Sequence, residues 1–105
     1  MNKQTKEKIE NLINSNKIFL FMKGTPDNVS CGFSARIVEA LDKLGLEYGY
    51  SNVLEDEEIR QAIKEYSDWP TIPQLFINGK FIGGVDIVEH LYFSGELQNL
   101  IEIKN

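Results

Sequence analysis

Cys31 is the residue of this sequence with the greatest potential for chemistry, because a cysteine thiolate is both a nucleophile and a soft metal ligand. It lies in the run Cys31-Gly32-Phe33-Ser34 and is the only cysteine among 105 residues. Ser34 stands where a second cysteine would complete a C-x-x-C motif. The chain cannot close an internal disulfide. Any disulfide or metal chemistry of Cys31 must therefore recruit sulfur from a small thiol, a second copy of the chain or another protein.

The position of Cys31 in the sequence favours the thiolate. A helix is expected to begin near Gly32 or Phe33, and a helix N-terminus carries unpaired N–H groups and partial positive charge that lower the pKa of a cysteine. Lys23, at the end of an apolar run, supplies a second positive charge. Plainer interpretations stay open: Cys31 as an inert buried thiol, Gly32 as a loop-to-helix residue, and Ser34 as an ordinary first-turn residue. We expect Phe33 to lie half in the core and half at its rim.

The composition narrows the classes of function. Eleven Lys and Arg residues against 16 Asp and Glu residues give a net charge of −5, which argues against nucleic acid as a partner. The longest apolar run, residues 18–22, is too short to cross a membrane. Residues 1–10 alternate Lys and Glu and lack the apolar segment of a secretory signal. A lone cysteine fits a reducing compartment: the cytoplasm, or an organelle such as the mitochondrion if a targeting segment was removed.

The first half of the chain is expected to place Cys31 between a strand and a helix. Apolar periodicity predicts a first helix, and five consecutive apolar residues predict a buried strand. Turn residues follow, then a second helix that ends at Gly45 and a second strand. These elements are predicted over residues 5–16, 18–22, 23–28, 33–44 and 46–53.

The second half is expected to add a helix, a hairpin and two more helices. A third helix begins near Asp56, and Asn78-Gly79 joins a strand over residues 74–77 to residues 81–82. Asp86 and Glu89 have the spacing of a capping box for the next helix, which Gly95 ends, and residues 97–101 form a short final helix. A βαβ half followed by a ββα half predicts one α/β domain over residues 1–105, with a core at about residues 17–95.

Four motifs in this order carry a family resemblance. They are Phe21-Met22-Lys23-Gly24, Ser30-Cys31-Gly32-Phe33-Ser34, Trp69-Pro70-Thr71-Ile72-Pro73-Gln74-Leu75 and Gly83-Gly84-Val85-Asp86. Together they resemble the monothiol glutaredoxins of the C-G-F-S type over essentially the whole chain. The resemblance implies a thioredoxin-like (glutaredoxin) fold, with a four-stranded mixed sheet flanked by helices and extra N- and C-terminal helices. It also implies bound glutathione and a role in carrying [2Fe–2S] clusters.

The resemblance assigns the reactive end of the site to Cys31, Gly32 and Phe33. Cys31 would be the cluster ligand and the site of mixed-disulfide formation with glutathione. Lys23 and Arg60 would bind the glycine carboxylate of glutathione. Without the motifs, Lys23 would be taken for a solvated residue after a strand and Arg60 for an ordinary surface arginine.

The remaining predicted site residues come from two later segments. The backbone of Thr71, Ile72 and Pro73 would pair with the cysteinyl part of glutathione, with Pro73 in the cis form, although proline also occurs simply at the start of strands. The N–H groups of Gly84, Val85 and Asp86 would hold the γ-glutamyl carboxylate at a helix N-terminus. Asp86 would also accept from the ammonium group, or act only as a helix cap. Trp69 is interpreted as a core or rim aromatic, and His90 is assigned no role.

The count of thiolates predicts how a cluster would be held. A [2Fe–2S] cluster usually takes four thiolate ligands, and one chain with one glutathione supplies two. A cluster-bridged homodimer completes the set, and the family adds a possible heterodimer with a BolA-like protein and transfer to iron–sulfur recipient proteins. Many relatives carry a second cysteine where this chain has Val85, so that route to an internal disulfide is absent.

Two functions follow from different classes of protein. The first is a cluster scaffold or carrier with weak or no enzymatic activity. The second is a glutathione-dependent thiol–disulfide oxidoreductase that removes glutathione from protein mixed disulfides by a monothiol mechanism. A regulatory binding module that senses iron through its cluster is a variant of the first that the sequence does not separate from it.

Overall fold

The central sheet has four strands in the order β4-β1-β5-β6, in a computed structural model that describes residues 1–102. β1 (Ile18–Met22) pairs in parallel with β4 (Gly49–Asn52) and antiparallel with β5 (Gln74–Ile77), which forms a hairpin with β6 (Lys80–Gly83). This four-stranded mixed sheet confirms the predicted architecture. The last three residues of the predicted domain, 103–105, lie outside the described residues.

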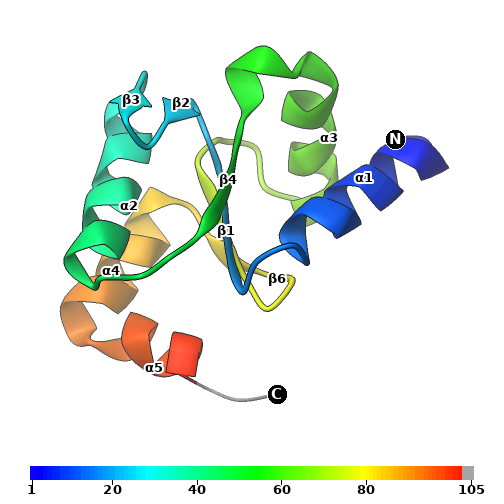
Figure 1. The fold of residues 1–105 in the computed structure, drawn as a ribbon. Helices are drawn as coiled ribbons and strands as arrows, with labels where there is room; N and C mark the ends of the chain where they lie inside the picture. The colour runs from blue at the N-terminus through cyan, green and yellow to red at the C-terminus, as the bar shows by residue number, and fades with distance from the viewer. Residues whose placement is uncertain (103–105) are drawn as a thin grey trace.

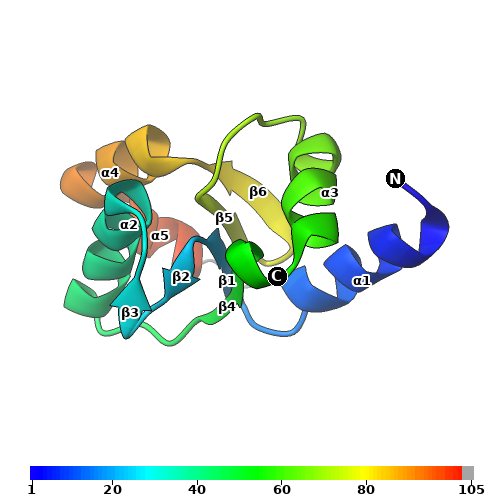
Figure 2. The same ribbon diagram turned by 90° about the horizontal axis from the view of Figure 1, so that it is seen from above.

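Helices cover both faces of the sheet (Figures 1 and 2). On one face lie α1 (Lys3–Ile13) and α3 (Glu57–Ser67), and on the other lie α2 (Gly32–Lys43), α4 (Val85–Ser94) and α5 (Glu96–Glu102). The predicted N- and C-terminal helices are thus present. None of these helices is long and apolar enough to cross a membrane.

The alternation of β1 builds two separate cores. Ile18, Leu20 and Met22 pack toward α2, α4 and α5, whereas Phe19 and Phe21 pack toward α1 and α3. All five side chains are buried, because both faces of this central strand are covered by helices. The buried strand holds the start of the next segment, at Lys23, in a fixed place.

Two segments differ from the sequence prediction. The predicted turn at residues 23–28 contains a small hairpin of β2 (Gly24–Thr25) and β3 (Asn28–Val29). The predicted strand at residues 46–53 is shorter, because residues 46–48 lie outside β4 and Val53 begins the 3-10 turn η1 (Val53–Glu55). The side chain of Asn52 accepts a hydrogen bond from the N–H of Leu54 and so caps that turn.

Two helix ends agree with the sequence prediction, and a third does not. α3 begins next to Asp56, as predicted, and Asp56 caps it by accepting from the N–H of Ile59 at 3.1 Å. Gly45 follows the end of α2 with φ of +68°, a conformation that suits glycine. The predicted capping box of α4 is wrong: Gly84 is the N-cap, and Asp86 lies inside the first turn. Glu89 instead forms an ion pair with Arg36 of α2.

Candidate functional site

The N-terminus of α2 presents Cys31 to solvent. Cys31 is the N-cap residue, with an extended backbone (φ −147°, ψ 130°), and its side chain is partly exposed. Its carbonyl oxygen accepts the first hydrogen bond of the helix, from the N–H of Ala35 at 2.9 Å. The thiol therefore stands beside the unpaired N–H groups of the first turn, where an anion is stabilised.

The surroundings of Cys31 favour its thiolate. Burial raises the pKa of Cys31, but the backbone N–H groups of Ser34 and Phe33, the hydroxyl of Ser34 and the charge of Lys23 all lower it. The net result is a pKa below the ordinary value for cysteine. Cys31 is thus a partly exposed thiol whose surroundings favour the thiolate, and the interpretation as a buried cysteine is wrong.

Ser34 has a structural role that the sequence left open. Its side chain is completely buried, and its hydroxyl oxygen accepts from the backbone N–H of Lys23 at 3.2 Å. This contact ties the end of β1 to the first turn of α2. Ser34 is therefore more than an ordinary first-turn residue, although no sequence signal identifies its partner eleven positions away.

The two residues between Cys31 and Ser34 face outward. Phe33 is 55% exposed, so the prediction that it lies half in the core is wrong. Gly32 is exposed, and apart from its two chain neighbours and the nearby backbone of its own helix, no atom of the described residues lies within 4 Å of a Cβ built at its position. The surface at Gly32 is thus open to solvent.

A cleft of about 420 Å³ lies between α3, the loop before β5 and the start of α4. Eight of the predicted site residues line this cleft: Lys23, Phe33, Arg60, Thr71, Ile72, Pro73, Val85 and Asp86. The other three predicted site residues do not line the cleft but lie within two positions of a residue that does. These are Cys31 and Gly32, beside Phe33, and Gly84, beside Val85. The structure therefore brings together residues from five separate segments of the chain, as the resemblance implied.

The cleft is cationic although the whole chain is acidic. Lys23, Arg60 and Lys64 line it, against the single carboxylate of Asp86. Sequence reasoning missed Lys64, yet its spacing of four residues from Arg60 on α3 was a usable signal, since residues at i and i+4 share a helix face. The buried Nε of Arg60 has no hydrogen-bond partner among residues 1–102. The terminal nitrogen Nη1 of Arg60 lies 3.9 Å from the carboxylate of Glu57, and the side chain is about one-third exposed.

The loop before β5 is held from beneath by Gln74. Gln74 is completely buried, and its side-chain amide donates to the carbonyl oxygens of Trp69 and Thr71, each at 3.1 Å. The Ile72–Pro73 peptide bond is cis, which confirms the prediction made from the resemblance. Sequence reasoning did not single out Gln74 as the residue that supports this loop.

Gly84 opens α4 at the edge of the cleft. It is the N-cap and has no side chain to cap the helix, so the N–H groups of the first turn lack a capping side chain. A Cβ on Gly84 would lie 3.0 Å from the indole nitrogen of Trp69, which leaves little room for a larger residue. Trp69 itself is partly buried and packs on Phe81, in line with its interpretation as a core or rim aromatic.

The fold and this site together define a thioredoxin-like thiol protein with one cysteine. A family model described as Glutaredoxin matches residues 18–82. A monothiol glutaredoxin of Synechocystis sp., described as uncharacterized, is 52% identical over 98% of this chain and 96% of its own length. The chain belongs to the glutaredoxin family, among relatives named monothiol glutaredoxins.

Solved structures support the same assignment. The solution structure of reduced apo GrxS14 from poplar matches with a TM-score of 0.82 and 48% identity, over 92% of this chain and 89% of that one. The crystal structure of a buckwheat glutaredoxin–glutathione complex matches with a TM-score of 0.83 and 29% identity, over 94% and 88% of the two chains.

Proposed function

We propose that this protein binds glutathione in its cationic cleft and carries a [2Fe–2S] cluster to recipient proteins. The observation that supports this most directly is the juxtaposition of an activated lone thiol, Cys31, with a cleft rich in positive charge. A chain with one cysteine needs an external thiol for either cluster or disulfide chemistry. The cleft is suited to supply it.

Glutathione matches the cleft group by group. It has two carboxylates and one ammonium, and Lys23 with Arg60 would take the glycine carboxylate. The main chain of Thr71 and Ile72 would pair with the cysteinyl part. The N–H groups at the start of α4 suit the γ-glutamyl carboxylate, and Asp86 suits the ammonium. The buckwheat relative, whose structure is a complex with glutathione, supports this choice of ligand.

A cluster would be shared cargo between two chains. Among residues 1–102, no three His, Cys, Asp or Glu side chains are grouped to hold a metal ion. Four thiolates are usual for a [2Fe–2S] cluster, so Cys31 and one glutathione from each of two copies complete the set. The partial exposure of Cys31 and the exposed ring of Phe33 leave room for the second copy. A BolA-like protein in place of one copy, and a reducing compartment such as the cytoplasm or mitochondrion, belong to the same proposal.

Anaerobic reconstitution with iron, sulfide and glutathione tests the proposal. We expect a brown dimer with visible absorption, and a colourless monomer when glutathione is omitted. Cys31→Ser should also stay colourless, while Ser67→Ala, a substitution on the last turn of α3, should bind the cluster like the wild type. A wild-type chain that takes up no cluster under these conditions would contradict the carrier role.

The lowered pKa of Cys31 also supports a second function, removal of glutathione from protein mixed disulfides. The Cys31 thiolate would attack the glutathione sulfur, break the disulfide and release the protein thiolate, which takes up a proton. A glutathione thiolate would then attack the Cys31 mixed disulfide, giving oxidised glutathione and free Cys31. A colourless monomer that rapidly deglutathionylates a peptide would favour this enzyme over the carrier.

A further inference from the structure

The main chain on both sides of Lys23 is held by side chains from other elements. The N–H of Lys23 donates to the hydroxyl of Ser34 at 3.2 Å, and the N–H of Gly24 donates to the side-chain oxygen of Asn52 at 2.9 Å. The carbonyl oxygen of Lys23 accepts from the N–H of Ser30 at 3.0 Å. Two consecutive peptide units at this position are thus anchored to α2, to β4 and to the end of β3.

Asn52 reaches Lys23 because of the strand register. In the parallel pairing of β1 and β4, Asn52 lies opposite Met22, the residue before Lys23. The same side-chain oxygen also accepts from the N–H of Leu54 at 3.1 Å, so it joins two backbone segments. Both hydrogen bonds are short enough to be effective. The bond from Leu54 is a local Asx turn, whereas the bond from Gly24 joins residues 28 positions apart.

The chain at Gly24 has little freedom to move. Gly24 has φ of +94°, and a Cβ there would lie 2.5 Å from the carbonyl oxygen of Asn28. Its N–H therefore points in a direction that the hairpin fixes, and Asn52 accepts it there. Loss of this acceptor would remove one of the two hydrogen bonds that hold the peptide unit after Lys23, and would leave the N–H of Gly24 without its partner.

We propose that Asn52 is a positioning residue, whose side-chain oxygen acts with the hydroxyl of Ser34 to fix where the ammonium of Lys23 lies in the cleft. A lysine side chain has four flexible carbons, so an anchored Cα reduces the ordering needed when the ammonium binds an anion. The inference rests on the proposed function, in which Lys23 binds the glycine carboxylate of glutathione. Asn52 would then act on that carboxylate through Lys23, without touching it.

The test measures dissociation constants by calorimetry for glutathione and for glutathione amidated at its glycine carboxylate. All chains carry Cys31→Ser, so that no mixed disulfide forms. We expect Asn52→Leu to weaken glutathione binding about fivefold, in line with the partial loss of one charge-assisted contact. Binding of the amidated ligand should not change. Asn52→Asp keeps the acceptor oxygen and should recover most of the affinity.

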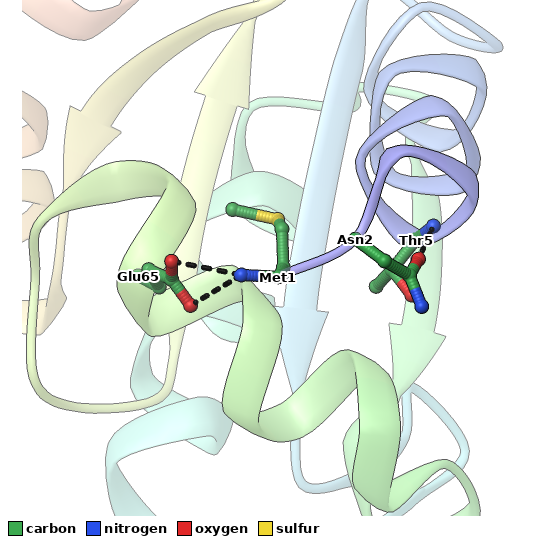
Figure 3. Close-up of polar contacts among 4 residues, drawn as sticks. All are labelled: Met1, Asn2, Thr5 and Glu65. Atoms are coloured by element: carbon green, nitrogen blue, oxygen red, sulfur yellow. Dashed lines mark hydrogen bonds and ion pairs between the residues drawn. The ribbon is translucent and has the colours of Figure 1, made fainter.

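Two further variants separate positioning from general loss of stability. The double variant Lys23→Gln/Asn52→Leu should bind no more weakly than Lys23→Gln alone, because Asn52 acts only through Lys23. Asn2→Leu removes a comparable contact, the cap that accepts from the N–H of Thr5 at 2.8 Å at the start of α1 (Figure 3), and should leave both affinities unchanged. If Asn52→Leu does not fold, Asn52→Ser replaces it, since its shorter side chain cannot reach both N–H groups.

The outcomes distinguish a failure of the proposed glutathione binding from a failure of the positioning role of Asn52. No binding of glutathione by the Cys31→Ser chain with all other residues intact would overturn the proposed function. If that chain binds and Lys23→Gln weakens binding, then unchanged affinity in Asn52→Leu would overturn the positioning role. Equal weakening for both ligands, or an additive double variant, would overturn it as well.

Discussion

Helix α3 separates two hollows of similar size and opposite charge. The cleft on one side has a volume of about 420 Å³, and the groove between α1 and α3 has about 400 Å³. The cleft is lined by three cations and one carboxylate, whereas the groove is lined by three glutamates. These charged residues are Lys23, Arg60, Lys64 and Asp86 in the cleft, and Glu57, Glu58 and Glu65 in the groove.

The helical period of α3 produces this contrast. Arg60 and Lys64, four residues apart, face the cleft, while Glu58, Gln61 and Glu65 face the groove. In the groove, the N-terminal ammonium of Met1 lies 2.9 Å from the carboxylate of Glu65 (Figure 3), so a cation of the chain itself meets the acidic wall. Volume alone does not distinguish the two hollows. The positive charge of the cleft and the neighbouring Cys31 make the cleft the one suited to the proposed anionic ligand.

The largest effect is expected on stability, from truncating a buried side chain that packs α3 onto the core. Ile63 is completely buried in the core shared by α1, α3 and β5. Ile63→Ala should lower the free energy of unfolding by about 2–5 kcal/mol, through lost burial and a new cavity. Denaturant unfolding measures this loss. A change below about 1 kcal/mol would mean that the helix repacks without it.

Charge reversal on the two faces of α3 tests the contrast directly. Arg60→Glu should weaken glutathione binding by about 1.5–3 kcal/mol, or roughly 10–150-fold, since a charge-assisted contact is replaced by repulsion. Glu65→Arg, on the opposite face, is the matched control and should leave the affinity near that of the wild type. Isothermal titration of both variants gives the comparison. Equal losses would show that the net charge of the chain, rather than the cleft, governs binding.

Local patterns predicted the elements that carry the site. Five apolar residues in a row gave β1 its correct bounds, and Asn78-Gly79 placed the hairpin of β5 and β6. Both signals depend only on neighbours in sequence, since a buried central strand and a tight turn each have a strong local preference. The cis form of Pro73 was confirmed, but that prediction came from the resemblance and not from local pattern.

Contacts between distant residues were not predictable in this way. The capping box at Asp86 and Glu89 was wrong because α4 begins earlier, with Gly84 as N-cap, and Glu89 pairs with Arg36, which lies 53 positions away. The partner of Ser34, the partner of Asn52 and the support that Gln74 gives to its loop all depend on how the sheet brings segments together. The hydrogen-bond partners of these polar side chains depend on which segments the packed fold brings together. The neighbouring residues in the sequence therefore do not indicate those partners.

The pH dependence of Cys31 alkylation tests a smaller effect, the influence of the charge of Lys23 on the thiol. Because the pKa of Cys31 lies below its ordinary value, its alkylation by iodoacetamide should reach half its maximal rate at lower pH than in the unfolded chain. The same shift stabilises the fold at pH above the unfolded pKa, and the gain is lost as pH falls through the folded pKa. Lys23→Gln should raise the pKa of Cys31 slightly, since Lys23 is the smallest of its causes. An unchanged alkylation profile would place Lys23 outside the electrostatic environment of the thiol.

The smallest effect is expected in the acidic groove. The pair between the Met1 ammonium and Glu65 is exposed on its glutamate side, at 64%, so water and salt screen it. Glu65→Gln should therefore lower the free energy of unfolding by less than about 1 kcal/mol, and the difference from wild type should vanish in about 1 M salt. Glutathione affinity should stay the same, because the pair lies across α3 from the cleft. A loss of affinity in Glu65→Gln would show that the two hollows are coupled through the helix, and that the opposite charges on its faces do not act independently.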